Sequence, residues 1–389
     1  MKVPLLDVRR QNASLETDLL AAFCRVLRSG QFILGQEVER FERTAADLAG
    51  ARFGIGMSSG TDAILTALMA LNIGPGDEVI CPSFTFFATA GCIARVGARP
   101  VFADSCLQCF NLDPSGIERL ITRRTKAIIP VHLFGQPADL EPILAIARRR
   151  GLAIIEDAAQ AFGAEYQGRP AGSIGEFGTV SFFPSKNLGA FGDAGLLITN
   201  DAALAGKARL LRNHGAHPKY FHGMIGGNFR LDAVQAALLA VKLPHLPEYT
   251  KKRQEHARTY DRAFREIRGR EAVQLVLPVT HPDRTHIANQ YTLRVCRGDD
   301  WNRTESPRDA LRQSLEKCGI ASEIYYPVPL HMQECFRHLG PQATLPVAEA
   351  LAGEVISLPV FPEMTPEEQS AVIDAVVDFA ASYQASEPV

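Results

Sequence analysis

The chain has 389 residues, enough for two domains that share a large buried surface, because a single hydrophobic core stops growing near about 250–300 residues. Its content of 46% hydrophobic and 22% charged residues is that of an ordinary soluble globular protein. With 41 basic and 43 acidic side chains the net charge is −2, so no basic excess favours nucleic acid or an anionic membrane as a partner.

The N-terminal segment has no apolar stretch of signal-peptide length, and no part of the chain approaches about 18 uninterrupted apolar residues. We therefore expect no transmembrane helix, and a cytoplasmic location in which the eight scattered cysteines are reduced and mostly buried. Cys106 and Cys109 have C-x-x-C spacing, but no second pair or nearby histidine accompanies them. This argues against a zinc site and leaves a redox role open.

Apolar periodicity and turn residues predict alternating helices and strands in the first part of the chain. In chain order these are helices over 15–28 and 36–49, a strand over 53–57, a helix over 63–71, a strand over 76–84, a helix over 88–96, a strand over 99–104, a helix ending near 121, a strand over 125–135, a helix over 140–151 and a strand from 152. Continuous apolar runs between helices are typical of a mostly parallel sheet buried on both faces. Ligands of such sheets bind beyond the carboxyl ends of the strands.

The C-terminal part of the chain predicts a smaller α/β domain. Its expected elements are a helix from 230 that is cut by Pro244 and Pro247, a helix over about 248–268, a strand over 290–296, a helix over 307–318, a strand over 320–326 and a helix over 366–382. We place a large domain at 1–247, including an N-terminal arm, and a small domain at 248–389. Residues 297–306 are interpreted as a solvent loop.

A single lysine, Lys186, follows a strand predicted near 178–183 and precedes a glycine-dense loop that ends at 195. Phenylalanine, proline and leucine surround it in the sequence. A lysine among apolar groups has its charged form disfavoured, so its pKa falls and the nucleophilic neutral amine is populated. Such a lysine most often forms a Schiff base with the carbonyl of pyridoxal phosphate, PLP. An ordinary surface lysine beside a turn is the alternative.

Three other strand ends carry what PLP needs besides a lysine: a phosphate anchor, a flat side chain against the ring and a carboxylate for the pyridine nitrogen. Residues 58–62 open a helix and can hold an anion at its positive end, although the same residue types serve as ordinary N-caps. Three phenylalanines within 84–87 can cover a ring or pack in a core. Asp157 ends an apolar strand, where a carboxylate needs a partner such as the pyridine nitrogen, or caps the next helix.

These four features occur in order on successive strand–helix junctions, and Ser181 adds a hydroxyl for the phosphate. Each feature alone is ordinary, but their joint occurrence by chance is improbable. The sequence therefore predicts a PLP enzyme.

Seven segments of the chain resemble the DegT/StrS family of nucleotide-sugar aminotransferases, in that family's order and spacing. They are SSGTDA at 58–63, PSFTFFAT at 82–89, EDAAQAFGAEY at 156–166, SFFPSKNLGAFGDAG at 181–195, RNHGA at 212–216, GGNFRLDAVQAALL at 226–239 and YYPVPLH at 325–331. The resemblance implies fold type I, the aspartate aminotransferase fold: an α/β large domain with a mostly parallel seven-stranded sheet, and a small C-terminal α/β domain. It also implies a homodimer with active sites at the subunit interface. Phe162 departs from the pattern, since many members carry a histidine there.

Carried over by position, the resemblance implies a role for four residues around the cofactor ring. Lys186 would be the catalytic residue that forms the Schiff base, and Asp157 would hold the pyridine nitrogen. Gln160 would contact the ring hydroxyl, and Phe86 would stack on the ring.

The resemblance also implies which residues hold the cofactor phosphate. Gly60, Thr61 and Asp62 would bind it through backbone N–H groups and the threonine hydroxyl, together with Ser181. Asn228 would reach the phosphate of the other subunit's cofactor.

The implied reaction moves an amino group from L-glutamate to a 3-oxo or 4-oxo group of a nucleoside-diphosphate sugar, forming an amino sugar for glycan or polysaccharide biosynthesis. Candidate substrate contacts in the matching motifs are His214, Arg230, Tyr325, Tyr326 and His331. Arg230 is the best placed for a diphosphate or carboxylate, because its planar fork binds such groups bidentately. The 181–186 and 158–163 segments look similar to members acting on UDP-2-acetamido-3-oxo-glucuronate.

Two other functions remain open within the same family. Sugar dehydratases of the family carry a histidine in place of the lysine, so Lys186 argues against that activity. A PLP-binding regulatory protein would need an added DNA-binding module, for which the N-terminus has neither the length nor the basic charge.

Overall fold

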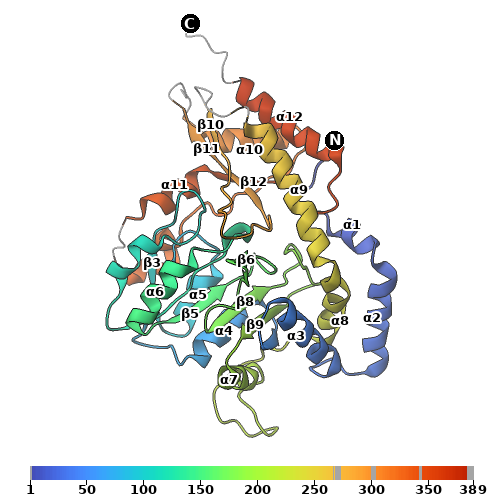
Figure 1. Cartoon of the computed structure of the whole chain (residues 1–389), viewed down its shortest axis with the longest axis vertical. Helices are drawn as coiled ribbons and strands as arrows, with labels where there is room; N and C mark the ends of the chain where they lie inside the picture. Colours follow the sequence, from blue (N-terminus) through green and yellow to red (C-terminus); the bar gives the residue numbers. More distant parts are fainter. Residues whose placement is uncertain (1, 266, 268–272, 299–303, 341–343, 383–389) are drawn as a thin grey trace.

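The computed structural model describes residues 2–265, 267, 273–298, 304–340 and 344–382, and a seven-stranded sheet forms its centre (Figure 1). Across the sheet the strands are β1 (Phe53–Met57), β9 (Gly195–Thr199), β8 (Phe177–Ser181), β5 (Ala153–Asp157), β4 (Thr125–Ile128), β2 (Glu78–Pro82) and β3 (Arg99–Ala103). Neighbours from β8 to β3 are parallel, whereas β9 runs antiparallel to both β1 and β8. The prediction of a mostly parallel seven-stranded α/β sheet is confirmed.

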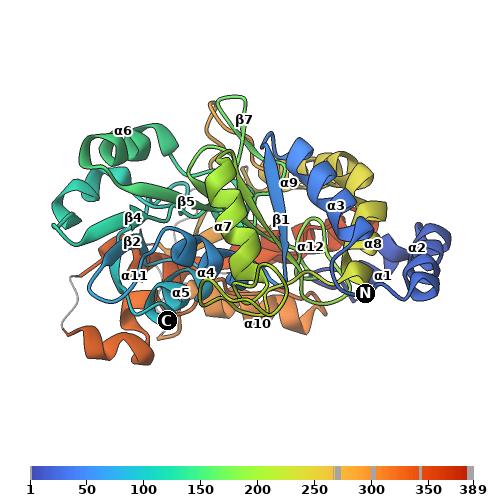
Figure 2. The same ribbon diagram turned by 90° about the horizontal axis from the view of Figure 1, so that it is seen from below.

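Helices cover both faces of this sheet, because its strands are apolar on both sides. One face packs against α4 (Gly60–Ala70), α5 (Ala88–Arg95) and α7 (Ala202–Arg212). The other packs against α3 (Gln36–Leu48), α8 (Ala233–Lys242) and α6 (Leu140–Arg150). In Figure 2, α6 lies above β4 and β5, while α4 and α5 lie below them. Successive residues such as Leu196 and Leu197 of β9 are both fully buried, one in the core of each face.

The C-terminal part forms a second, antiparallel sheet, seen at the top of Figure 1. Its strands are β10 (Val273–Val276), β11 (Tyr291–Arg297) and β12 (Val355–Leu358), and it shares a core with α9 (Leu246–Arg265), α10 (Pro307–Lys317) and α12 (Pro366–Ser382). Val3 packs in the same core, so the N-terminal arm contacts the C-terminal part. The division at residue 247 stays a prediction.

Two predicted elements are wrong. The helix expected to end near residue 121 is replaced by two short 3-10 turns, Pro114–Gly116 and Glu118–Leu120. The stretch between the Asp113 cap and the turn at Thr122 is too short, and too interrupted by proline and glycine, for a regular helix. The strand expected over 320–326 makes only isolated bridges, from Ile320 to Val3 and from Glu323 to Ser357.

Several elements had no counterpart in the sequence prediction. Besides α7, β9, β10 and β12 these include α1 (Val8–Ala13), α11 (Pro346–Glu354) and the short hairpin of β6 (Glu165–Tyr166) and β7 (Arg169–Pro170). The helix predicted over 15–28 is α2 (Glu16–Ser29). Of the expected solvent loop at 297–306, residues 299–303 lie outside the described residues.

Candidate active site

A cavity of about 450 Å³ lies at the carboxyl ends of β5 and β8, beside the first turn of α4. This is the edge at which parallel α/β sheets bind their ligands. The structure brings most of the predicted site residues together here: Gly60, Thr61, Phe86, Asp157, Gln160, Ser181, Lys186, Tyr325 and Tyr326 all line the cavity.

One end of the cavity is the N-terminus of α4. Ser59 caps this helix by accepting a hydrogen bond from the Asp62 backbone N–H at 3.0 Å. The N–H groups of Gly60 and Thr61 belong to the first turn, which has no carbonyl of its own helix to bond, so they can bind an anion. A Cβ on Gly60 would lie 2.8 Å from the Ser181 Cβ, so glycine is required for this close approach.

Asp62 does not line the cavity with its side chain. Its carboxylate accepts a hydrogen bond from the Ser58 hydroxyl at 2.6 Å. Since its backbone N–H is bonded to the Ser59 side chain, its contribution to an anion site would be the capped geometry of the turn.

Asp157 supplies a buried carboxylate at the end of β5, with 5% of its surface exposed. One oxygen accepts a hydrogen bond from the Thr89 hydroxyl at 2.7 Å, and the other accepts one from the Ala159 backbone N–H at 3.2 Å. Burial raises the pKa of Asp157, which these hydrogen bonds and the positive charge of Lys186 oppose. A cationic N–H group entering the cavity would stabilise the ionised form.

Lys186 follows β8 and lines the same cavity. Burial lowers the pKa of its amine to about 8, and Asp157 partly opposes that change. The turn that carries it is closed by a backbone hydrogen bond from the Lys186 N–H to the Phe183 carbonyl, 2.8 Å. Near neutral pH the cavity therefore contains an amine that loses its proton far more readily than an ordinary lysine.

Gln160 is held at both ends of its amide. Its Oε1 accepts a hydrogen bond from the Phe134 backbone N–H at 2.6 Å, and its Nε2 donates to the Tyr326 hydroxyl at 3.1 Å. Phe86 has 56% of its surface exposed, and its ring centroid lies 6.0 Å from that of Tyr326. An aromatic side chain this exposed at a cavity wall is available to cover a flat ligand.

The structure does not place every predicted residue at the cavity. His214, Asn228 and Arg230 lie on the segment 213–230 that follows α7, where the Arg230 Nη1 donates to the Asn213 side chain at 2.8 Å. His331 has a buried side chain, which pairs with the Ser83 hydroxyl at 2.6 Å and with Glu349 at 3.3 Å. Their substrate roles stay predictions.

Several cavity residues were missed by sequence reasoning. Thr85, Ser185, Asp193 and Gln290 line the cavity, and Thr89 holds Asp157 from behind. Thr85 and Thr89 lie in the segment 82–89, in which a role is predicted only for the phenylalanines. Gln290 directly precedes β11, far away in sequence, and no local pattern marks it.

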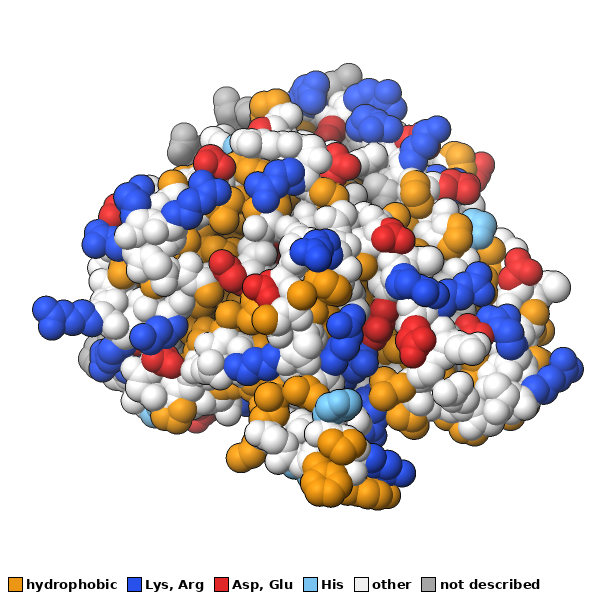
Figure 3. Space-filling model, turned by 60° about the horizontal axis from the view of Figure 1, so that its bottom comes forward, with side chains coloured by type: hydrophobic (Ala, Val, Ile, Leu, Met, Phe, Trp, Pro, Cys, Tyr) orange, Lys and Arg blue, Asp and Glu red, His pale blue; other side chains and the backbone are white. Residues whose placement is uncertain are grey.

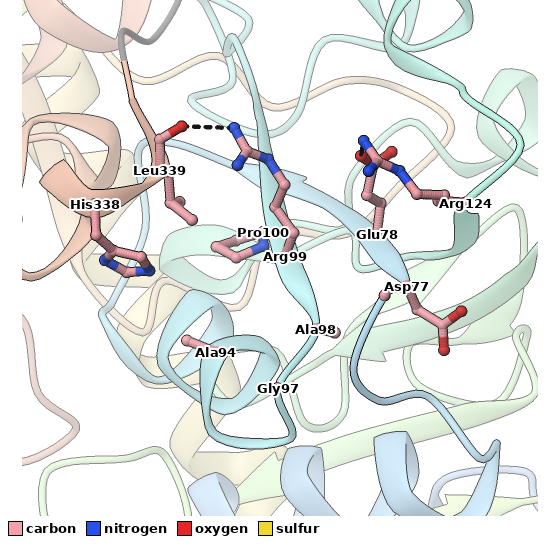
Figure 4. Close-up of a pocket in the computed structure, with 11 residues that line it drawn as sticks. Asp77, Glu78, Ala94, Gly97, Ala98, Arg99, Pro100, Arg124, His338 and Leu339 are labelled. Atoms are coloured by element: carbon pink, nitrogen blue, oxygen red, sulfur yellow. Dashed lines mark hydrogen bonds and ion pairs between the residues drawn. The ribbon is translucent and has the colours of Figure 1, made fainter.

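A second hollow, of about 300 Å³, lies at the amino ends of β2 and β3 (Figure 4). Arg124 there is paired with Glu78 at 2.6 Å, and Arg99 donates to the Leu339 carbonyl at 2.8 Å. Both arginines already have partners within the protein. We therefore assign the candidate active site to the cavity at the carboxyl ends of β5 and β8. Among the described residues there is no cluster of three potential metal ligands.

Residues 13–377 match the model of the DegT/DnrJ/EryC1/StrS aminotransferase family. The chain belongs to this family. The expectation of a PLP-dependent aminotransferase is confirmed, and the cavity contains a helix N-terminus, a carboxylate and a lysine, the kinds of group that this cofactor requires. Within the described part of the chain, no helix is long and apolar enough to cross a membrane.

Relatives match nearly the whole chain. It is 48% identical over 380 residues to a pleiotropic regulatory protein of Geobacillus stearothermophilus, covering 97% of this chain and 99% of the relative. It is 45% identical over 375 residues to a UDP-N-acetyl-3-dehydro-alpha-D-glucosamine 3-aminotransferase of Acidithiobacillus ferrooxidans, covering 96% and 97%. It is 41% identical to a UDP-2-acetamido-2-deoxy-3-oxo-D-glucuronate aminotransferase of Pseudomonas aeruginosa, covering 92% and 95%.

Solved structures share the fold. DesV of S. venezuelae matches with a TM-score of 0.91 at 41% identity, covering 97% of this chain and 98% of that one. The ntda protein of Bacillus subtilis, solved with bound cofactor PMP, matches with a TM-score of 0.89 at 34% identity, covering 98% and 85%. The predicted fold type is confirmed.

Proposed function

We propose that this protein transfers an amino group from L-glutamate to the 3-oxo group of a nucleoside-diphosphate sugar. The observation that carries the proposal is the placement of Lys186, Asp157 and the α4 N-terminus around one cavity. The relatives from A. ferrooxidans and P. aeruginosa, both named for 3-oxo sugar nucleotides, support the choice of substrate.

The chain's own residues would hold PLP by its phosphate and by its ring. The backbone N–H groups of Gly60 and Thr61, with the Ser181 hydroxyl, would bind its phosphate, and Asp62, whose own N–H bonds to the Ser59 side chain, would support them through the helix cap. When bound, PLP supplies an aldehyde that accepts an amino group and a ring that withdraws electrons from it.

The ring would lie between the remaining residues. Asp157 would accept the hydrogen bond of the protonated pyridine nitrogen, and its negative charge would keep that nitrogen protonated. Gln160, oriented by Phe134 and Tyr326, would contact the ring hydroxyl. Phe86 would cover the exposed face.

Lys186 would carry the proton in each half of the reaction. Its Nζ, with a pKa lowered to about 8 by burial, would accept a proton from the donor's α-carbon near neutral pH and would give it to the carbon that was the aldehyde carbon of PLP. Such a base is most effective when its pKa lies near the working pH.

Arg230 is our candidate for an acidic group of the sugar nucleotide. Its Nη1 is bound to Asn213, but its Nε is buried with no hydrogen-bond partner. A diphosphate or a uronic acid carboxylate would satisfy this donor. His214, Tyr325, Tyr326 and His331 remain further candidates for substrate contact. Among the sugar nucleotides, UDP-2-acetamido-3-oxo-glucuronate is the substrate we put first.

A homodimer with shared active sites is part of the proposal, with Asn228 reaching the partner's cofactor. Regulation is the second candidate function, because the G. stearothermophilus relative is named for it. A protein that only binds PLP has no need of a lysine activated toward proton transfer, so Lys186 favours the enzyme.

The test begins with the visible spectrum of the purified protein with PLP, before and after L-glutamate. We expect conversion to the pyridoxamine form and release of 2-oxoglutarate, both abolished in Lys186→Ala. The converted protein is then offered 3-oxo and 4-oxo sugar nucleotides. Amination of 4-oxo sugars alone contradicts the proposed substrate, and no response to glutamate contradicts an aminotransferase that uses this donor.

A further inference from the structure

The carboxylate of Asp157 is held from behind by a residue that does not line the cavity. Thr89, in the first turn of α5, is fully buried and donates its hydroxyl hydrogen to one Asp157 oxygen at 2.7 Å. The second oxygen takes the Ala159 N–H. Each carboxylate oxygen therefore has one bond from the protein, and the plane of the carboxylate is fixed from two sides.

This arrangement matters because Asp157 is almost completely buried. Burial opposes its ionisation, and a hydroxyl that donates to the charged oxygen stabilises the ionised form. With its hydrogen given to Asp157, the threonine also prevents the carboxylate from rotating. Lone pairs not used by Thr89 and Ala159 remain for a donor that enters the cavity.

We propose that Thr89 is a positioning residue for the cofactor: its hydroxyl orients Asp157 so that the carboxylate meets the pyridine nitrogen in the right plane. This inference rests on the proposed cofactor role of Asp157. Thr89 itself would touch neither cofactor nor substrate, and it acts through Asp157.

A matched control lies on the neighbouring helix α4. Thr66 is also fully buried, but its hydroxyl has no hydrogen-bond partner. Replacing either threonine by valine keeps the shape and removes a hydroxyl. Only at Thr89 does that substitution remove a hydrogen bond to the site.

The experiment measures the equilibrium dissociation constant of PLP for the apo form of the full chain. We expect Thr89→Val to weaken binding roughly 10- to 100-fold, the usual range for one hydrogen bond to a charged group. Thr89→Ser retains a hydroxyl and should stay within about threefold of the unmodified protein, and Thr66→Val should leave the constant unchanged. Equal losses in the valine and serine variants of Thr89 would show that packing, not the hydroxyl, matters, and would overturn the proposal.

A double-mutant cycle with Asp157→Asn separates positioning from a general effect on the fold. If Thr89 acts through the carboxylate, Thr89→Val should weaken PLP binding less than about threefold in the Asp157→Asn background. Full additivity of the two substitutions contradicts the proposal. If the unmodified apo protein does not bind PLP at all, the proposed function fails first, so the two failures are distinguishable.

Discussion

At the scale of single residues, the candidate site combines a half-buried lysine and a buried carboxylate, whose pKa values are shifted in opposite directions by burial. Lys186 must lose a proton near neutral pH, and burial lowers its pKa to about 8. Asp157 must stay ionised, yet burial raises its pKa and only hydrogen bonds and nearby positive charge oppose this. In the proposed function a bound pyridinium would supply the missing counter-charge, so that the cofactor and the carboxylate would each stabilise the charged form of the other.

The lowered pKa of Lys186 predicts how the apo protein captures PLP. At pH 7 about 10% of an amine with a pKa near 8 is neutral, against roughly 0.03% for an ordinary lysine. The rate at which the visible absorbance of bound cofactor develops should rise with pH, reach half of its maximum near pH 8 and level off about one pH unit higher. A midpoint near 10.5 would contradict the assignment, and Lys186→Ala should show no such absorbance.

Glu156 directly precedes Asp157 in the chain, and removal of its carboxylate should destabilise the fold strongly. Its carboxylate is fully buried and accepts hydrogen bonds from His132 at 2.9 Å and from the backbone of Gly172, Ile174 and Gly175 at 2.6–2.9 Å. Glu156→Ala leaves all four donors without this partner. We expect the free energy of unfolding to fall by about 3–5 kcal/mol, measured by urea denaturation.

The same carboxylate should make the stability of the fold depend on pH. Burial alone would raise the pKa of Glu156, but the bonds from His132 and the backbone hold it below the ordinary 4.5. Its contribution to stability is therefore present above pH 4.5 and is lost as the pH falls through the folded-state pKa. The exposed Glu141 is the control: Glu141→Ala should change stability by less than about 0.5 kcal/mol.

At the scale of elements, β9 and α4 approach so closely that only glycine fits between them. A Cβ on Gly195 would lie 2.4 Å from the backbone carbon and oxygen of Ser59, the residue that caps α4. The antiparallel strand β9 thereby sets the position of the helix N-terminus at the anion end of the cavity.

Gly195→Ala should therefore displace the cap and weaken PLP binding by about tenfold or more, measured by titration of the apo protein. Gly206 in the middle of α7 is the control, since nothing lies within 4 Å of a Cβ placed there. Gly206→Ala should leave binding unchanged and stabilise the fold by about 0.5–1 kcal/mol. Unaltered binding in Gly195→Ala would show that β9 does not position the helix.

At the scale of the whole molecule, apolar side chains gather on a segment that projects from the body. The segment after α7 extends at the bottom of Figure 1, and Figure 3 shows hydrophobic side chains at its tip. Tyr220, Phe221 and Ile225 on this segment are 79%, 69% and 90% exposed. Apolar groups so exposed in one chain are expected to be covered by another, in agreement with the proposed homodimer.

Replacing Tyr220, Phe221 and Ile225 together by serine should weaken self-association by at least about tenfold, measured by sedimentation equilibrium. Leu107→Ser, at a less exposed apolar residue on another loop, is the control and should leave association unchanged. A variant that remains dimeric at the same concentrations as the unmodified protein would show that this segment is not part of the interface.

The sequence by itself determined six of the seven strands of the large sheet, all except β9, together with the lysine and the carboxylate as site candidates, because apolar runs, helix caps and glycine-dense turns are local signals. Only the tertiary structure decided what surrounds those groups. Thr89 bonds to a residue 68 positions away, and Gln290 reaches the cavity from the start of a distant strand. The strand expected over 320–326 failed for the same reason: pairing between strands depends on partners far along the chain, which a local pattern does not contain.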